Sequence, residues 1–344
     1  MPADVHSEFE RIRALVAGLP HGEGVVIGPG DDAAVLRPRD GADLVVTTDA
    51  FVAGRHWRPG LLPLAGVGRR LAAANLSDLA AMGATPRWAV IACGVPAGTA
   101  EAETRAIEQA CAAALAAEGA AVVGGNLSAT DGAAWFAVTL LGEVARGAAL
   151  TRGGAREGDV LAVTGYPGRA AAVLALALDV EPATLAGVPE ALAAAYAAPP
   201  CRVRAARAMA AAGGVHAAID LSDGLAGDLA HLMRASDAGA VLDAGRWPVD
   251  AALYAAAARL AQRTQGEAAE TIAARLPLEP GDDYELLLAI APERFDACRA
   301  AAAAEGAPLT VIGEVIAASR GLLLRAAAGT EAALVARGFD HFGI

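Results

Sequence analysis

The sequence predicts an α/β (α+β) protein built of two mixed α/β domains. Its 344 residues exceed the usual domain size of about 100 to 200 residues. Short apolar, β-branched segments alternate with alanine-rich helical patterns along the whole chain. A glycine-rich polar stretch at 147–158 interrupts this alternation near the middle. We therefore expect one domain over 1–148 and a second over 149–344.

The first predicted element is a helix that begins near Ser7 and runs to about Ala17. Ser7 and Glu10 have the spacing of a capping box, and apolar residues follow at helical intervals. A strand at Val25–Ile27 comes next, and the glycines and proline of 28–32 end it in a turn. This turn carries two adjacent aspartates.

Strands and helices then alternate to the predicted boundary. Apolar segments predict strands at Ala33–Leu36, Leu44–Thr48, Trp88–Cys93, Ala121–Val123 and Ala134–Val144. Helical patterns cover Leu64–Met82 and 99–118. Asp49 is expected at the carboxyl end of its strand, and Asn75 and Asp78 share a helix face because they are three residues apart.

The second half continues the same alternation. Strands are predicted at Asp159–Thr164, Ala217–Ile219, Glu285–Ile290 and Leu309–Val315. Helices are predicted at 168–178, 189–196, 201–212 and after Ser222-Asp223-Gly224.

Charge excludes several functional classes. There are 39 acidic and 27 basic side chains, a net charge of −12, and every basic residue is an arginine. Without lysine there is neither a Walker A loop nor a Schiff-base enzyme. A protein this acidic repels nucleic acid, but it can bind a phosphorylated small molecule through divalent metal ions.

The four cysteines and the apolar segments point to a reduced, non-membrane environment. The cysteines are widely spaced without a CxxC pair, so we expect buried, reduced thiols rather than a zinc site or disulfides. No apolar run approaches the roughly 20 residues of a membrane span, and the charged amino terminus does not resemble a secretory signal. We expect a cytoplasmic protein with no membrane partner.

Eight aspartates, most of them near predicted strand ends, are the main candidates for chemistry. They are Asp31, Asp32, Asp49, Asp78, Asp220, Asp223, Asp282 and Asp283. Ligands of α/β proteins generally bind beyond strand ends, and carboxylates there suit Mg²⁺. Aspartates also cap helices and fill turns, but the apolar flanks of Asp49 and Asp220 favour a bound cation because burial desolvates the carboxylates.

Three further sequence features each allow a functional and a structural interpretation. Gly124-Gly125-Asn126 either lets a nucleotide approach the backbone or forms a simple turn. Arg152 either binds phosphate or is an exposed loop residue, and His56 is either a ligand or a packed side chain. Neither a GxSxG elbow nor an HExxH helix is present.

A series of segments along nearly the whole chain resembles the thiamine-monophosphate kinases. In order they are GPGDDAAVL (28–36), TTDAFVAGRHW (47–57), NLSDLAAMGATP (75–86), VVGGN (122–126), ALTRGGAREGD (149–159), AIDLSDGL (218–225), GDDYELL (281–287) and GFDHF (338–342). The resemblance implies transfer of the γ-phosphoryl group of ATP to thiamine monophosphate, directly in line and with several Mg²⁺ ions. It implies no phosphoenzyme, so no catalytic residue is assigned.

The resemblance also implies ligand roles and a partner. The implied metal ligands are Asp32, Thr47, Thr48, Asp49, Asp78, Asn126, Asp220 and Asp223. The implied nucleotide-binding residues are Gly125, Asn126, Arg152 and Ser222, and those at the thiamine moiety are His56, Asp282 and Phe339. The N-terminal domain, which would bind ATP and Mg²⁺, is expected to pair its sheet with that of a second copy, giving a homodimer.

Two residues depart from the family pattern. Asn126 replaces the usual aspartate, so the amide offers one carbonyl oxygen to a metal instead of a carboxylate. Phe339 replaces a tyrosine or tryptophan and keeps the stacking face. Two alternatives remain: another ATP-dependent synthetase of the aminoimidazole-ribonucleotide-synthetase superfamily, and a catalytically silent protein that binds nucleotide or thiamine phosphate. The His56 region and GFDHF disfavour the first, and only Asn126 favours the second.

Overall fold

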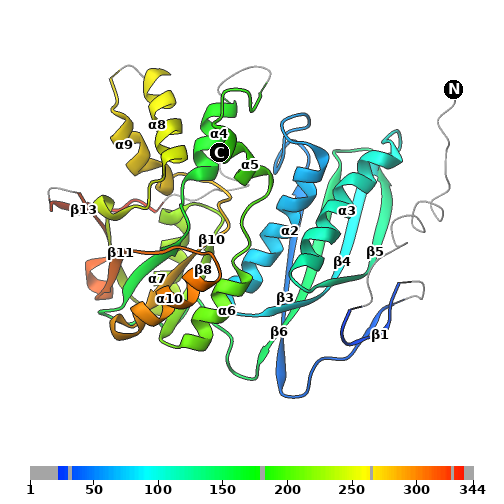
Figure 1. Ribbon diagram of the computed structural model, residues 1–344, viewed down its shortest axis with the longest axis horizontal. Helices are drawn as coiled ribbons and strands as arrows, with labels where there is room; N and C mark the ends of the chain where they lie inside the picture. Colours follow the sequence, from blue (N-terminus) through cyan, green and yellow to red (C-terminus); the bar gives the residue numbers. More distant parts are fainter. Residues whose placement is uncertain (1–21, 30–32, 179–182, 264–265, 327–328, 337–344) are drawn as a thin grey trace. The chain divides into compact units, whose positions relative to one another are not determined.

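A computed structural model describes residues 22–29, 33–178, 183–263, 266–326 and 329–336 (Figure 1). The chain divides into two compact units. The N-terminal unit takes in the chain up to Leu79 together with Ala84–Ala148, and the C-terminal unit takes in Ala80–Gly83 and the chain from Ala149 on. The helix predicted over 7–17 lies outside the described residues.

The N-terminal unit is built on a four-stranded mixed sheet. Its strands, in spatial order, are β3 (Ala42–Val52), β6 (Trp135–Ala145), β4 (Thr85–Pro96) and β5 (Ala121–Thr130). The β3–β6 and β6–β4 pairs are antiparallel and the β4–β5 pair is parallel. A separate small sheet pairs β1 (Val25–Ile27) with β2 (Val35–Leu36).

Two helices cover one face of this sheet. They are α2 (Leu64–Ala81) and α3 (Glu101–Ala117), and Figure 1 shows them side by side on the same side of the strands. Alternate residues of β6, namely Phe136, Val138 and Leu140, are buried, as a one-sided core requires. We call this the helix face of the sheet and the opposite side the outer face.

The predicted ends of two strands were wrong. Asp49 does not end β3, because β6 pairs with β3 as far as Val52 and places Asp49 opposite Val138. Likewise β5 does not end at Gly124 but continues beside β4 to Thr130, so the simple turn considered for Gly124-Gly125-Asn126 is not present. In both cases a neighbouring strand extends the pairing beyond the apolar run.

The C-terminal unit contains a seven-stranded sheet. In spatial order the strands are β13 (Glu331–Ala333), β12 (Leu322–Arg325), β9 (Gly239–Asp243), β11 (Leu309–Ile316), β7 (Val160–Thr164), β10 (Glu285–Ile290) and β8 (Val215–Leu221). Neighbours are antiparallel except β9 and β12. Asp220, predicted to follow its strand, lies within β8 because β10 pairs with it to Leu221.

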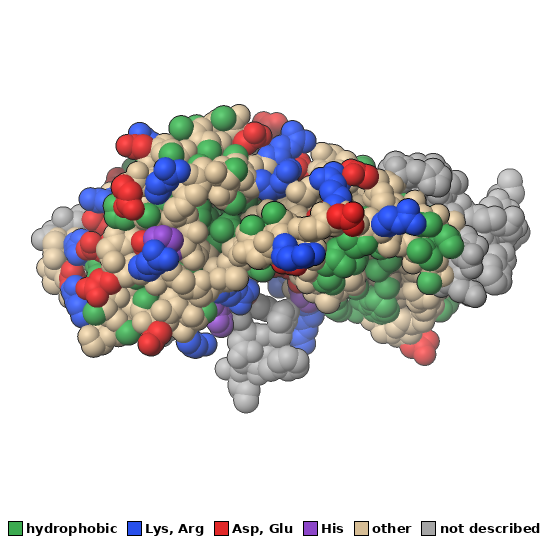
Figure 2. Space-filling model, turned by 90° about the horizontal axis from the view of Figure 1, so that it is seen from below, with side chains coloured by type: hydrophobic (Ala, Val, Ile, Leu, Met, Phe, Trp, Pro, Cys, Tyr) green, Lys and Arg blue, Asp and Glu red, His purple; other side chains and the backbone are tan. Residues whose placement is uncertain are grey.

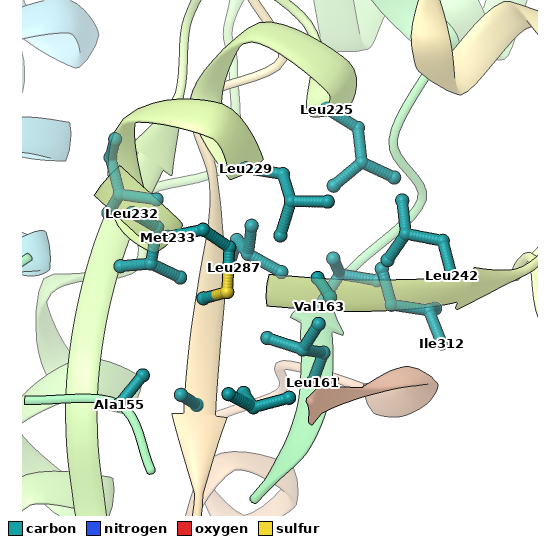
Figure 3. Close-up of a cluster of buried hydrophobic side chains, with 14 of the residues drawn as sticks. Ala155, Leu161, Val163, Leu225, Leu229, Leu232, Met233, Leu242, Leu287 and Ile312 are labelled. Carbon is teal, nitrogen blue, oxygen red and sulfur yellow. The ribbon is translucent and has the colours of Figure 1, made fainter. Parts of the chain in front are cut away.

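Helices surround this second sheet. They are α4 (Arg169–Leu178), α5 (Glu190–Ala197), α6 (Val203–Ala212), α7 (Leu225–Ser236), α8 (Ala251–Arg263), α9 (Ala269–Arg275) and α10 (Phe295–Ala304). Figure 3 shows Leu225 of α7 directed toward Leu242 of the sheet, and Leu229 and Met233 of α7 directed toward Leu287, and all five are at most 2% exposed. Helix α7 is therefore fixed on the sheet along its length.

The cysteines mostly follow the expectation from sequence. Cys93, Cys111 and Cys298 are buried and Cys201 is exposed, and all are free thiols. Within the described ranges, no helix combines the length and hydropathy needed to cross a bilayer.

Candidate nucleotide and metal site

Three of the predicted metal ligands lie on the helix face of the N-terminal sheet. The Thr47 hydroxyl of β3 donates a hydrogen bond of 2.5 Å to Asp78 Oδ2 of α2. Asp49 shares the face of Thr47 because the two are separated by one residue on the strand. The next residue on that face, Phe51, is 4% exposed and anchors β3 in the core. The structure thus gathers oxygen donors from β3 and α2 on one side of the sheet.

Thr48 and Asn126 lie on the outer face instead. Thr48 donates from Oγ1 to the Val138 carbonyl over 3.0 Å and accepts from Thr139 Oγ1 over 3.1 Å. Asn126 belongs to a cross-strand row that also contains Ala92, Ala137 and Ala50, and residues paired in this way share a face. The hydroxyl of Thr48 and the amide of Asn126 are therefore not brought to Thr47 and Asp78, and Asp32 lies outside the described residues.

Gly125 occupies a position where a side chain does not fit. A Cβ built there would lie 2.1 Å from the Ile91 carbonyl oxygen of β4. The close approach follows a register shift at Ala89 and Val90, where β5 carries an extra residue. Asn126 itself is exposed and donates from Nδ2 to Ser128 Oγ over 3.0 Å, a bond that does not use its carbonyl oxygen.

His56 is held just beyond the end of β3. Its Nδ1 accepts a hydrogen bond of 3.1 Å from the Val52 amide, so the neutral ring carries its proton on Nε2. The imidazole stacks on Phe51 with ring centroids 5.6 Å apart and planes 17° apart. A half-buried aromatic ring with a fixed tautomer results.

In the C-terminal unit a buried aspartate organises the turn between β8 and α7. Asp228 is 3% exposed, and its Oδ2 accepts from the amides of Ser222 and Asp223, each over 3.1 Å. Burial raises the pKa of Asp228 to about 7, although these two amides and the positive charge of Arg152 act in the opposite direction. The Ser222 turn is therefore a rigid feature, and Arg152 lies close enough to influence the same carboxylate.

The segment 281–284 lies beside that turn. The Tyr284 amide donates to the Leu221 carbonyl over 2.9 Å, which places Asp282 and Asp283 next to the end of β8. The Asp283 carboxylate accepts from the amides of Gly168 and Ala170 at the start of α4, over 2.6 and 2.8 Å. Burial raises the pKa of Asp283 to about 7 despite these amides. Asp283, considered as a metal ligand from sequence, thus caps a helix, as aspartates commonly do.

The structure therefore brings together Asp220, Ser222, Asp223 and Asp282 in one unit and Thr47, Asp49 and Asp78 in the other. Phe339 is not among the described residues. In the described part of the chain, no three His, Cys, Asp or Glu side chains cluster as a complete metal site. Sequence analysis missed Asp228 as a site residue; its place in the first turn of a helix, after a Ser-Asp-Gly start, was the available signal.

Comparison with known proteins assigns the chain to a family. Residues 30–144 match the AIR synthase related protein, N-terminal domain, and residues 156–323 match the C-terminal domain of the same family. The thiamine-monophosphate kinase of Escherichia coli (strain K12) is 35% identical over 318 residues, which is 92% of each chain. The chain belongs to the thiamine-monophosphate kinase family. The resemblance and the two-part mixed α/β fold predicted from sequence are both confirmed.

Solved structures of thiamine-monophosphate kinases share this fold. The crystal structure of the enzyme from Stenotrophomonas maltophilia K279a aligns with a TM-score of 0.78 and 33% identity, covering 94% of this chain and 96% of that one. AaThiL complexed with AMPPCP and TMP aligns with a TM-score of 0.74 and 25% identity over 89% of both chains. That member of the family thus binds an ATP analogue and TMP together.

Proposed function

We propose that this protein phosphorylates thiamine monophosphate, transferring the γ-phosphoryl group of ATP to its phosphate to give thiamine diphosphate and ADP. The observation that carries the proposal is identity of 35% with a thiamine-monophosphate kinase over 92% of the chain. The alignment with AaThiL complexed with AMPPCP and TMP supports the same two substrates.

The donor chemistry of the candidate site fits Mg²⁺. Thr47, Asp49 and Asp78 offer only oxygen atoms, which Mg²⁺ prefers, and Asp220 and Asp223 offer a second oxygen set. Mg²⁺ usually binds through one or two carboxylates, with water and substrate phosphates completing the shell, so three clustered acids are not required. When bound, the ions would neutralise charge on the two phosphorylated substrates.

Other residues would bind and orient the substrates. Arg152 supplies a planar cation for the ATP phosphates where lysine is absent, and Ser222 supplies a hydroxyl on a rigid turn. The acceptor is a phosphate oxygen that is already largely ionised near neutral pH, so no general base is needed. His56 and Asp282 offer an aromatic face and a negative charge to the cationic thiazolium ring.

Incubation of the purified protein with Mg²⁺ and ATP tests the proposal directly. Thiamine diphosphate should form from thiamine monophosphate, while unphosphorylated thiamine and aminoimidazole ribonucleotide precursors should react far more slowly. Equal rates with free thiamine would show that the acceptor phosphate is not recognised. Turnover only with a carbonyl or amide substrate would favour a synthetase, and ATP binding without turnover would favour a silent binding protein.

Replacing Asn126 with aspartate should lower the Mg²⁺ requirement. The carboxylate adds one negative charge, worth about 1 to 4 kcal/mol toward a cation roughly 4 Å away in a wet site. Asn126 is exposed on the outer face, away from Thr47 and Asp78, so the cation in question would be a separate ion bound with the nucleotide, and the change does not disturb the core. The Mg²⁺ concentration that gives half the maximal rate should therefore fall, with little change in the KM for thiamine monophosphate.

Mg²⁺ titrations at fixed ATP compare the N126D variant with the wild type. Asp131→Asn, an exposed change in the loop after β5, controls for altered surface charge in the same unit. Superimposable wild-type and N126D curves, or a higher requirement in N126D, would contradict a metal-binding role for this position.

We also propose that a second copy of the chain packs on the outer face of the N-terminal sheet. Leu44 and Val46 on this face of β3 are 48% and 59% exposed, which is unusual for large aliphatic side chains on a strand. Figure 2 shows hydrophobic side chains gathered on the right-hand part of that view. Exposed aliphatic side chains on a sheet face are typical of a surface that pairs with its own copy.

A charge on the outer face of β3 should separate the copies. In a two-fold interface Val46→Glu would bury two unpaired carboxylates, one from each copy. We therefore expect the variant to be a monomer at micromolar concentration and the wild type to be a dimer. Light scattering coupled to gel filtration measures the mass. Val249→Glu, at a 39% exposed valine of the C-terminal unit, is the matched control and should stay dimeric. A monomeric wild type, or a dimeric V46E variant, would contradict the proposed interface.

A further inference from the structure

The last turn of α7 holds the loop that carries Arg152. Ser236 donates from Oγ to the Arg152 carbonyl over 2.9 Å and accepts from the Ala155 amide over 3.1 Å. Between these two contacts the loop leaves no space for a side chain, because a Cβ on Gly153 would lie 2.9 Å from the Ala235 carbonyl oxygen. The Ser236 hydroxyl thus holds the loop on both sides of Gly153, where the loop backbone lies close to the backbone of α7.

The same loop is fastened to strand β8 on its other side. The Ala218 amide donates to the Thr151 carbonyl over 2.9 Å, so the loop continues the pairing at the edge strand of the sheet. A Cβ on Gly154 would lie 2.7 Å from the His216 carbonyl oxygen. The Arg152 loop therefore lies between β8 and the end of α7.

The first turn of α7 holds the other nucleotide-binding segment. Asp228 Oδ2 accepts from the amides of both Ser222 and Asp223, and its own amide donates to the Gly224 carbonyl over 3.1 Å. Asp228 and Ser236 are eight residues apart in sequence, which corresponds to about 12 Å along an α-helix. Because the buried leucines of α7 fix this helix on the sheet, the distance between its two ends is fixed too.

We propose that Asp228 and Ser236 are positioning residues, through which α7 sets the Arg152 loop and the Ser222 turn at the spacing that the phosphates of a nucleoside triphosphate require. The proposal rests on the proposed function in one respect, that Arg152 and Ser222 bind the nucleotide. It assigns Asp228 and Ser236 a role that acts through the backbone groups they hold in the Ser222 turn and the Arg152 loop.

Ser236→Ala removes both hydrogen bonds at the Arg152 loop. Loss of this anchoring should raise the KM for Mg²⁺-ATP and the Kd for AMPPCP about tenfold, since each neutral hydrogen bond contributes modestly. The KM for thiamine monophosphate should stay within about twofold, because the loop is assigned to the nucleotide side. Ser236→Thr keeps the hydroxyl and should restore most of the affinity.

Variants at Gly153 and Asp228 test the geometry at the two ends of α7. Gly153→Ala should weaken AMPPCP binding in the same direction, because the added methyl meets the Ala235 carbonyl. Its matched control is Gly98→Ala, where nothing lies within 4 Å of the new Cβ. Asp228→Asn keeps an oxygen acceptor and should bind AMPPCP far better than Asp228→Ala, which leaves two amides without that partner.

AMPPCP binding, measured by calorimetry with Mg²⁺, separates this inference from the proposed function. A wild type that binds AMPPCP but phosphorylates no thiamine monophosphate would overturn the function and leave the positioning test intact. Unchanged AMPPCP affinity in S236A and G153A would overturn the positioning role. So would an equal loss for both substrates together with a lower melting temperature, because that pattern shows general destabilisation, and so would a wild type that binds no nucleotide.

Discussion

Asp49→Asn should reduce the rate of thiamine diphosphate formation at least about 100-fold while the protein stays folded. Phosphoryl transfer depends almost entirely on positioning and charge neutralisation, and removing one preorganised electrostatic contact commonly costs this much. Asparagine has the shape of aspartate, and Asp49 is only half-buried on β3, so packing is preserved. The rate is measured at saturating ATP, thiamine monophosphate and Mg²⁺, beside circular dichroism and thermal melting.

Asp220→Asn, in the C-terminal unit, should have an effect of the same size. Asp131→Asn is the control for loss of one acidic charge at an exposed loop and should retain wild-type turnover. Near-normal turnover of D49N or D220N at saturating Mg²⁺ would contradict the metal-binding role. Loss of the folded state would instead identify that carboxylate as a structural group.

Local pattern was sufficient to predict most elements of the fold. The strand at Val25–Ile27 has the predicted bounds, and the helix predicted over Leu64–Met82 ends one residue earlier, at Ala81. Such elements could be predicted because apolar periodicity and glycine or proline boundaries act within a few residues. The alternation of strand and helix then required two layers, whatever the order of the strands.

Strand ends depended on partners distant in sequence. Asp49 looked terminal because the apolar run stops there, yet β6 pairs with β3 through Val52. Gly124 and Gly125 looked like a turn, yet β4 keeps β5 extended through them. Neither partner can be identified from residues near the break, because strand pairing is set by the whole sheet.

These errors affected the reading of the site. Once Thr47, Thr48 and Asp49 are all within one strand, the alternation of side chains separates Thr48 from the other two. For a different reason, the roles of Asp228 and Ser236 were not predicted from the sequence. Asp228 binds amides five and six residues away, but Ser236 binds a loop 81 and 84 residues earlier, and no local pattern records such a contact.

Arg202→Met should destabilise the protein by about 3 to 5 kcal/mol, the usual cost of removing one partner of a buried ion pair. The guanidinium donates to both Glu285 oxygens, over 2.5 and 2.6 Å, and both residues are less than 10% exposed. Thr164 Oγ1 donates to Glu285 over 2.6 Å and accepts from the Leu286 amide over 2.8 Å. The pair therefore links the start of α6 to the neighbouring strands β7 and β10, and urea unfolding measures its contribution.

The double variant R202M/E285L tests whether R202M is unstable because hydrogen bonds are lost or because the buried Glu285 carboxylate is left without its cation. In R202M the Glu285 carboxylate stays buried and keeps the hydrogen bond from the Thr164 hydroxyl but loses its cation. Most of the expected loss of stability therefore comes from desolvation of the unpaired carboxylate. Removing both charges should recover at least half of that loss, because apolar side chains fill the same space without a desolvation penalty. A double variant as unstable as R202M would show instead that the hydrogen bonds and their geometry, rather than the unpaired charge, determine stability at this junction.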